Sequence, residues 1–148
     1  MQRILTLVAV LALLTGCANA IDGKATMAPT TDEWRNAVVD SVVEMGTYLG
    51  PISAAMAPTN YPALQTGCGK LRDYLDTMQH KVLPGPDANI NSALQDGIDG
   101  YRSMAKQCMA LTSTTTIAEI LRLSDTIDRA DKRMKDALKL LGVKIPRR

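Results

Sequence analysis

Three cysteines and a single histidine are the residues of this chain that are best suited to chemistry. The cysteines stand at positions 17, 68 and 108, and the histidine is His80. A thiol can act as a nucleophile, a metal ligand or a disulfide partner, and each role needs its own sequence setting. The sequence has no C-x-x-C pair and no second histidine. It therefore gives no local support for thiol redox chemistry, haem attachment or a histidine-based zinc site.

Cys17 ends the tetrapeptide Leu14-Thr15-Gly16-Cys17, which follows Arg3 and an apolar run from Ile4 to Leu14. A basic tip, an apolar run and small residues before a cut are typical of a secretory signal peptide. With a cysteine at that cut, the first 17 residues resemble a bacterial lipoprotein precursor. The resemblance implies cleavage between Gly16 and Cys17, and a diacylglycerol on the Cys17 thiol. Two or three acyl chains, palmitate among them, would anchor the protein stably.

A second cleavage site overlaps the first. Ala18-Asn19-Ala20 fits the A-x-A pattern of ordinary signal peptidase, which would remove Cys17 and release a soluble protein that starts at Ile21. An uncleaved membrane span is excluded by length, because a span needs about 20 apolar residues and this run covers only positions 4 to 14. We favour the lipoprotein, because four consecutive positions match at the end of the apolar run.

Length and charge favour one domain. We expect a signal peptide over residues 1–16, a lipidated cysteine with a flexible tether over 17–30, and a folded domain over 31–148. Loss of Arg3 leaves 16 basic and 15 acidic residues, so nucleic acid is not predicted as a partner. The charge is uneven, at −3 over residues 22–60 and +4 over 117–148. The first and last helices of a bundle would pair these charges if they were neighbours.

Cys68 and Cys108 form an even pair once Cys17 is assigned to lipid. Export takes the chain to an oxidising compartment, so we expect one disulfide between them. Both cysteines lie on apolar faces of predicted helices. Counted from the turn between those helices, Cys68 is about 22 Å away and Cys108 about 30 Å. A later start of the second of these helices or a crossing angle would remove the mismatch.

Apolar residues recur at three- and four-residue steps in four segments, which predicts four helices. They begin near Thr30 or Thr31, near Asn60, near Asp87 or Asn89, and near Thr116. Capping boxes are predicted at Thr30 with Glu33 and at Thr116 with Glu119. Gly50-Pro51 predicts a kink or break in the first helix, with a shorter piece up to Ala57. No segment alternates with period two, and the connections are short. We therefore predict an all-α, antiparallel four-helix bundle with one disulfide.

Each predicted helix has one apolar face. The first face is expected to contain Trp34, Val38, Ser41 or Val42, Met45, Leu49, Ile52 and Met56; the second Tyr61, Leu64, Cys68, Leu71, Leu75, Met78 and Val82; the third Ile90, Leu94, Ile98, Tyr101, Ala105, Cys108 and Leu111; and the fourth Ile117, Ile120, Leu121, Ser124, Ile127, Met134, Leu138 and Leu141. Gly97 and Gly100 are poor helix formers, and we interpret them as sites of close helix packing.

Catalytic and metal-binding patterns are not found in the sequence. His80 lies off the apolar face, which favours a surface position, and Thr77 stands where a di-iron Glu-x-x-His pair needs glutamate. The many aspartates alternate with basic residues, as on a solvated helix face. We predict no enzyme, no cofactor and no metal. One candidate contact surface for anionic headgroups or wall polymer is the basic face of the last helix, formed by Arg129, Lys132, Arg133, Lys135 and Lys139.

The general style of the chain is similar to small exported helical lipoproteins of actinobacteria and their phages, without a shared motif beyond the lipobox. The sequence therefore predicts a lipid-anchored envelope protein on the extracytoplasmic side of the membrane. We expect a non-enzymatic binding or interaction module with an envelope protein as partner. The alternative is a carrier of a lipid or other apolar ligand between the helices, because the chain has no Phe and one Trp.

Overall fold

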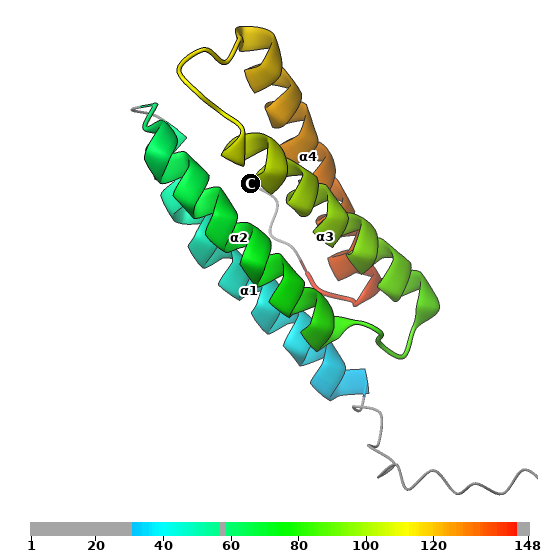
Figure 1. Cartoon of the computed structure of the whole chain (residues 1–148). Helices are drawn as coiled ribbons and strands as arrows, with labels where there is room; N and C mark the ends of the chain where they lie inside the picture. The colour runs from blue at the N-terminus through cyan, green and yellow to red at the C-terminus, as the bar shows by residue number, and fades with distance from the viewer. Residues whose placement is uncertain (1–30, 57–58, 145–148) are drawn as a thin grey trace, which may run out of the picture.

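The computed structural model describes residues 31–56 and 59–144, which form four helices (Figure 1). These are α1 (Thr31–Met56), α2 (Tyr61–Val82), α3 (Ala88–Met109) and α4 (Ile117–Leu140). No strand occurs among these residues. The all-α bundle predicted from the sequence is confirmed. The predicted signal peptide, Cys17, the tether and the Thr30 cap lie outside the described residues.

Side-chain caps fix where three of the helices begin. Asn60 accepts a hydrogen bond from the Ala63 amide before α2, and Asp87 accepts from the amides of Asn89 and Ile90 before α3. Thr116 and Glu119 form the predicted capping box at the start of α4. Each cap satisfies backbone N–H groups that have no partner in the first helical turn. The predicted starts of these three helices are confirmed, as are the caps predicted at Asp87 and Thr116.

Close helix packing follows chain order, with α1 against α2, α2 against α3, and α3 against α4. The first and last helices do not form a comparably close pair. Ion pairs connect Arg133 of α4 to Asp96 of α3 and Lys139 to Asp136 within α4. In these pairs the bases of the last helix contact α3 and α4 rather than the acidic first helix.

The centre of the bundle is filled by side chains from α1, α2 and α3. The largest fully buried ones are Leu71, Leu75, Met78, Leu94, Ile98, Met104, Val38 and Val82. The faces predicted for α2 and α3 are buried apart from the half-buried Tyr61 and Ile90. Cys68 and Cys108 form the predicted disulfide within this core, with their Cα atoms 6.1 Å apart. Because α3 begins at Ala88, a later start of this helix does not remove the predicted offset.

Of the kink or break predicted at Gly50-Pro51, the break is wrong, because α1 is one helix from Thr31 to Met56 with Pro51 inside it, and the kink stays a prediction. The stretch after Pro51 keeps its helical register by packing, since Ile52 and Ala55 are buried. A Cβ on Gly67 of α2 would lie 3.0 Å from Cγ1 of Ile52, so the two helices are in close contact there. The helix therefore continues past a proline that cannot donate its backbone hydrogen bond, with the stretch beyond it packed against α2. Met56, predicted to lie inward, is 41% exposed.

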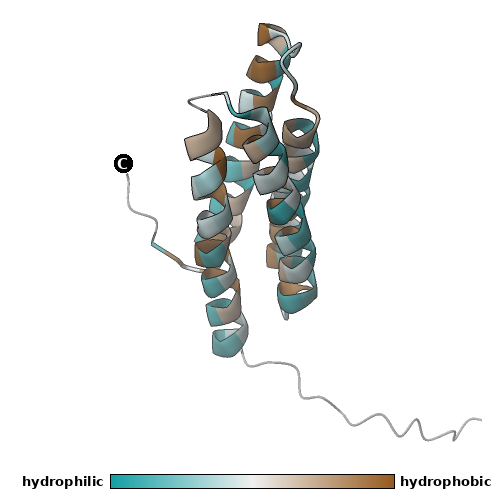
Figure 2. Ribbon diagram, turned by 60° about the vertical axis from the view of Figure 1, so that its left-hand side comes forward, coloured by the Kyte–Doolittle hydropathy of each residue, from teal (hydrophilic) through white to brown (hydrophobic). Residues whose placement is uncertain are grey.

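The face predicted for the last helix is wrong over its N-terminal half. Ile117, Ile120, Leu121 and Ser124 are exposed, whereas the buried residues are Leu123, Thr126, Ala130, Met134, Ala137 and Leu141. Ile127 and Leu138 are half-buried beside them. Figure 2 shows the N-terminal end of α4 as a brown end that extends beyond the neighbouring helices. The helix is therefore rotated relative to its apolar pattern, and its first turns lack a covering neighbour.

Gly97 and Gly100 explain this rotation. A Cβ on Gly97 would lie 3.3 Å from Cα of Met134, and one on Gly100 would lie 3.1 Å from Cα of Ala130. At such short separations even a methyl group would require the neighbouring helix to move by a few tenths of an ångström, so glycine favours this close approach. The predicted role of these glycines in close packing is confirmed. The fit of α3 against Ala130 and Met134 therefore determines which face of α4 turns inward.

Candidate binding groove between the ends of α3 and α4

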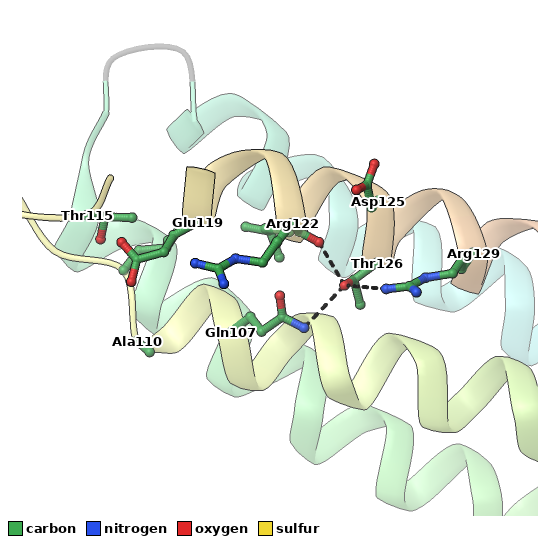
Figure 3. Close-up of a pocket in the computed structure, with 10 residues that line it drawn as sticks. Gln107, Ala110, Thr115, Glu119, Arg122, Asp125, Thr126 and Arg129 are labelled. Carbon is green, nitrogen blue, oxygen red and sulfur yellow. Dashed lines mark hydrogen bonds between the residues drawn. The ribbon is translucent and has the colours of Figure 1, made fainter. Parts of the chain in front are cut away.

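A surface groove lies between the C-terminal end of α3, the connection that follows it, and the N-terminal half of α4. Its volume is about 590 Å³. Most of its lining is polar or charged, and Figure 3 shows how these side chains lie. The lining residues are Gln107, Ala110, Leu111, Thr115, Glu119, Arg122, Leu123, Asp125, Thr126 and Arg129.

Thr126 connects the two helices at the floor of the groove. Its hydroxyl donates to the carbonyl of Arg122 at 2.8 Å. The same oxygen accepts from Gln107 Nε2 at 3.2 Å and from Arg129 Nη2 at 3.3 Å. A hydroxyl has one donor and two acceptor sites, so all the hydrogen-bonding sites of this group are used. Thr126 therefore positions Gln107 and Arg129 and has nothing left for a ligand.

Arg122 is the cation of the groove that has no hydrogen-bond partner. Its side chain extends from α4 back toward Glu119, above Gln107 (Figure 3). No residue that the structure describes accepts a hydrogen bond from its guanidinium group or pairs with it within 4 Å. A guanidinium group carries five N–H donors and stays charged at all relevant pH values. Arg122 is thus equipped to bind an anion.

Glu119 carries a fixed negative charge at one end of the groove. Its Oε2 accepts from the Thr116 amide at 2.7 Å and from the Thr116 hydroxyl at 2.8 Å. The hydrogen bond from the Thr116 backbone, followed by that from its side chain, lowers the pKa of Glu119. Asp125 lines the groove from the other side of Arg122, and its carboxylate points away from α3 (Figure 3). The lining therefore combines two cations with two anions.

An apolar surface lies on the same turns of α4. Ile117 is 78% exposed, Leu121 60% and Ile120 41%. Their three- and four-residue spacing places them on one side of the helix. We call this set the apolar turn. Exposed apolar residues that occur singly need no explanation, but a contiguous group of large ones marks an interaction surface.

Comparisons with known proteins assign this chain to no group. No protein-family model, no curated protein and no solved structure matches it. Among the residues that the structure describes, no helix is both long and apolar enough to cross a membrane.

Only part of the predicted basic face of α4 lines the groove. Arg129 lines the groove, and with Lys132, Arg133 and Asp136 it also lines an adjoining hollow of about 320 Å³. Arg133 pairs with Asp96 at 2.5 Å and Lys139 with Asp136 at 3.1 Å, so these two cations are already partnered. Lys135 is exposed and belongs to neither hollow.

Sequence reasoning missed Arg122 and Gln107. Arg122 stands seven residues before Arg129, and this two-turn spacing on a helix was the available signal. Gln107 gave no signal of its own, because only the packing of α3 on α4 brings its amide to Thr126.

Features that would suggest catalysis lie elsewhere or are partnered. His80 is exposed on α2 and lines a separate shallow hollow with Gln79 and Asn91. The aspartates of α2 and α3 take part in ion pairs such as that of Asp76 with Arg102 at 2.6 Å. Within residues 31–56 and 59–144, no three His, Cys, Asp or Glu side chains are placed to hold a metal ion. The groove lining itself contains no histidine or cysteine.

Proposed function

We propose that this protein is a lipid-anchored protein of the bacterial cell envelope that acts as a non-enzymatic binding module for an envelope protein. The observation that carries the proposal is the apolar turn of Ile117, Ile120 and Leu121, exposed at the end of the bundle beside the polar groove. Burying such side chains against a partner is favourable by about 25 cal/mol per Å² of apolar area. The lipid anchor is supported by the Leu14-Thr15-Gly16-Cys17 motif.

The position of the apolar turn relative to the proposed anchor supports a protein partner. Thr31, the first residue of α1, lies at one end of the bundle, and the start of α4 lies at the other (Figure 1). A helix of 26 residues spans about 39 Å. A domain tethered through residues 17–30 would therefore present the apolar turn away from its own membrane when it stands upright.

The filled interior is why we prefer surface binding to the carrier alternative. The central side chains of α2 and α3, such as Leu75 and Ile98, have no exposed surface. A carrier would need an apolar space between the helices, and ligand pockets of this kind measure about 300 to 1,000 Å³. The hollows described above, and a further one of about 780 Å³ beside Tyr48 and Pro62, open on the outside of the bundle rather than between buried helix faces.

The anchor is tested by metabolic labelling with a fatty acid and by the N-terminal sequence of the mature protein. We expect the wild-type protein to incorporate the labelled fatty acid and the Cys17→Ala variant to incorporate none. An unlabelled mature protein that begins at Ile21 would refute the anchor and leave the binding proposal to be tested as a soluble one.

The binding role is tested by crosslinking and pull-down of the lipidated protein from its own envelope, with mass spectrometry of the captured proteins. We expect the double variant Ile117→Ser, Leu121→Ser to lose the partner. Val43→Ser is the matched control, because Val43 is 69% exposed on α1, away from the groove. A captured partner retained equally by both variants would refute the role of the apolar turn, and no capture by the wild type would refute the binding module.

A further inference from the structure

We propose that the groove between α3 and α4 binds an acidic polypeptide segment of the partner, with Arg122 and Arg129 as the two carboxylate-binding side chains. The inference rests on the proposed function, because it names the chemistry that the partner presents at this end of the bundle. It goes beyond that function by assigning a second contact, distinct from the apolar turn.

The two arginines are the cations of the groove with donors to spare. Arg129 gives one long hydrogen bond of 3.3 Å to the neutral hydroxyl of Thr126, and Arg122 gives none within the described part of the chain. By contrast, Arg133 is held by Asp96 and Lys139 by Asp136. An incoming carboxylate can therefore bind Arg122 and Arg129 without breaking an existing ion pair, and guanidinium groups match carboxylates with two parallel hydrogen bonds.

The spacing of the arginines sets the spacing of the groups that they bind. Residues seven apart on a helix lie on nearly the same side, about 10.5 Å apart along its axis. Acidic residues about three positions apart in an extended chain, or about seven apart in a helix, span the same distance. The floor between the arginines is the neutral hydrogen-bonded pair of Gln107 and Thr126. It accommodates the uncharged residues that separate two acids.

The mixed charge of the lining favours a polypeptide over a membrane surface or an anionic polymer. A uniformly anionic surface would bring negative groups against Glu119 and Asp125 as well as against the arginines. The low pKa of Glu119 keeps its carboxylate charged. A polypeptide carries separate acidic side chains, which can pair with the two arginines, and backbone N–H groups between them, which can donate to Glu119 and Asp125. The groove is also recessed between two helices, so a single chain reaches its floor and a flat bilayer does not.

The test selects peptides from a random twelve-residue display library on the full chain held in neutral detergent micelles. Selection is repeated on Arg122→Gln and on Arg129→Gln. Lys135→Gln is the matched control, because it removes the same charge from an exposed site outside the groove. All these positions are exposed, and thermal unfolding of each variant verifies that the fold is kept.

We expect the wild type to enrich peptides with two or more Asp or Glu residues, with spacings that peak near three or seven. Each arginine variant should weaken binding of an enriched peptide about three- to fivefold, which is the size of an exposed ion pair. Lys135→Gln should leave it within about twofold. An absence of acidic enrichment, or an equal loss in Lys135→Gln, overturns the inference.

Anionic vesicles and inorganic phosphate are tested as competitors of the enriched peptides, and they distinguish an acidic peptide from a lipid headgroup or a small anion as the ligand. Saturable binding of vesicles that depends on Arg122 and Arg129, without acidic peptide enrichment, would assign the groove to lipid headgroups and overturn the inference. The same result with phosphate would assign it to a small anion. If the groove binds no acidic peptide, the pull-down result that depends on Ile117 and Leu121 is not affected. The two proposals can therefore be refuted separately.

Discussion

Gly100 of α3 lies so close to Ala130 of α4 that a Cβ on Gly100 would be 3.0 Å from the Cβ of Ala130. Ala130 itself is fully buried by this contact. The close approach draws the small residues of α4 inward and leaves Ile117 and Leu121 outside the core. The packing of these two helices therefore creates the exposed surface on which the proposed function depends.

Gly100→Val is expected to destabilise the protein by about 1 to 3 kcal/mol, as overpacking of a filled interface does. The added methyl groups would push α4 away from α3 at Ala130. Urea unfolding followed by circular dichroism measures the change. Gly46→Ala is the control, since Gly46 lies inside α1 with no atom within 4 Å of an added Cβ. It should stabilise the protein by about 0.5 to 1 kcal/mol through helix propensity. Equal stability of Gly100→Val and wild type would contradict the packing argument.

Trp34 gives a direct optical test of the turn between α2 and α3. Its Nε1 donates to the carbonyl of Val82 at 2.7 Å, and its ring is 3% exposed. A Cβ on Gly85 would lie 2.0 Å from the Cε2 atom of that ring. Gly85→Ala should therefore displace the indole, shift its fluorescence emission to longer wavelength, and cost about 2 to 4 kcal/mol.

The emission is unambiguous because the chain has one tryptophan. Gly46→Ala, far from the indole, should leave the spectrum unchanged. A Gly85→Ala protein with wild-type emission and unfolding would show that the turn moves at little cost, against the geometry described here.

The sequence predicted those parts of the fold that depend on local signals. Helix starts at Asp87 and Thr116 were correct because a cap acts over three residues of the same chain. The disulfide was correct because two cysteines on apolar faces leave one pairing once Cys17 is set aside. In both cases the deciding information lies within one segment or in a simple count.

The wrong predictions concern features that depend on how two helices pack against each other. Apolar spacing alone placed Ile117, Ile120 and Leu121 inward, but Gly97 and Gly100 select a different face of α4, which only the packed pair reveals. The groove was missed for the same reason, since Gln107 and Thr126 become neighbours through that packing. Pro51 is a third case, in which tertiary contacts of Ile52 overrule a local breaking signal.

Removing the disulfide should lower stability without changing the fold. The cysteines are 40 residues apart, and in the chain-entropy model the closure of such a loop is worth about 4 kcal/mol. Cys68→Ser combined with Cys108→Ser should therefore shift the urea midpoint strongly downward and keep the helical circular dichroism spectrum. Reductant should destabilise the wild type to a similar extent and have no effect on the double variant. A wild type insensitive to reductant under unfolding conditions would argue against the bond.

Alkaline pH should destabilise the protein through Tyr74. Its hydroxyl donates to the carbonyl of Ser41 at 2.7 Å and lies 3.3 Å from Oε2 of Glu44, while its ring stacks on Tyr48. Burial, followed by the negative charge of Glu44, raises the pKa of Tyr74 from 10 to about 12. The folded state therefore keeps the phenol proton where the unfolded chain has lost it. The stability that this provides is complete below pH 10 and is lost as the pH rises toward 12.

Unfolding free energies measured by urea titration between pH 9 and pH 12 test this sign. The wild type should lose stability more steeply across that window than Tyr74→Phe, whose ring keeps the packing but has no proton to lose. Absorbance of tyrosinate at 295 nm should show a phenol that titrates near pH 12 in the wild type and is missing from the variant. A Tyr74→Phe protein with the wild-type pH slope would place the alkaline sensitivity elsewhere. Burial also raises the pKa of Tyr101, which donates to Asp131, so Tyr101→Phe serves as the second variant to compare.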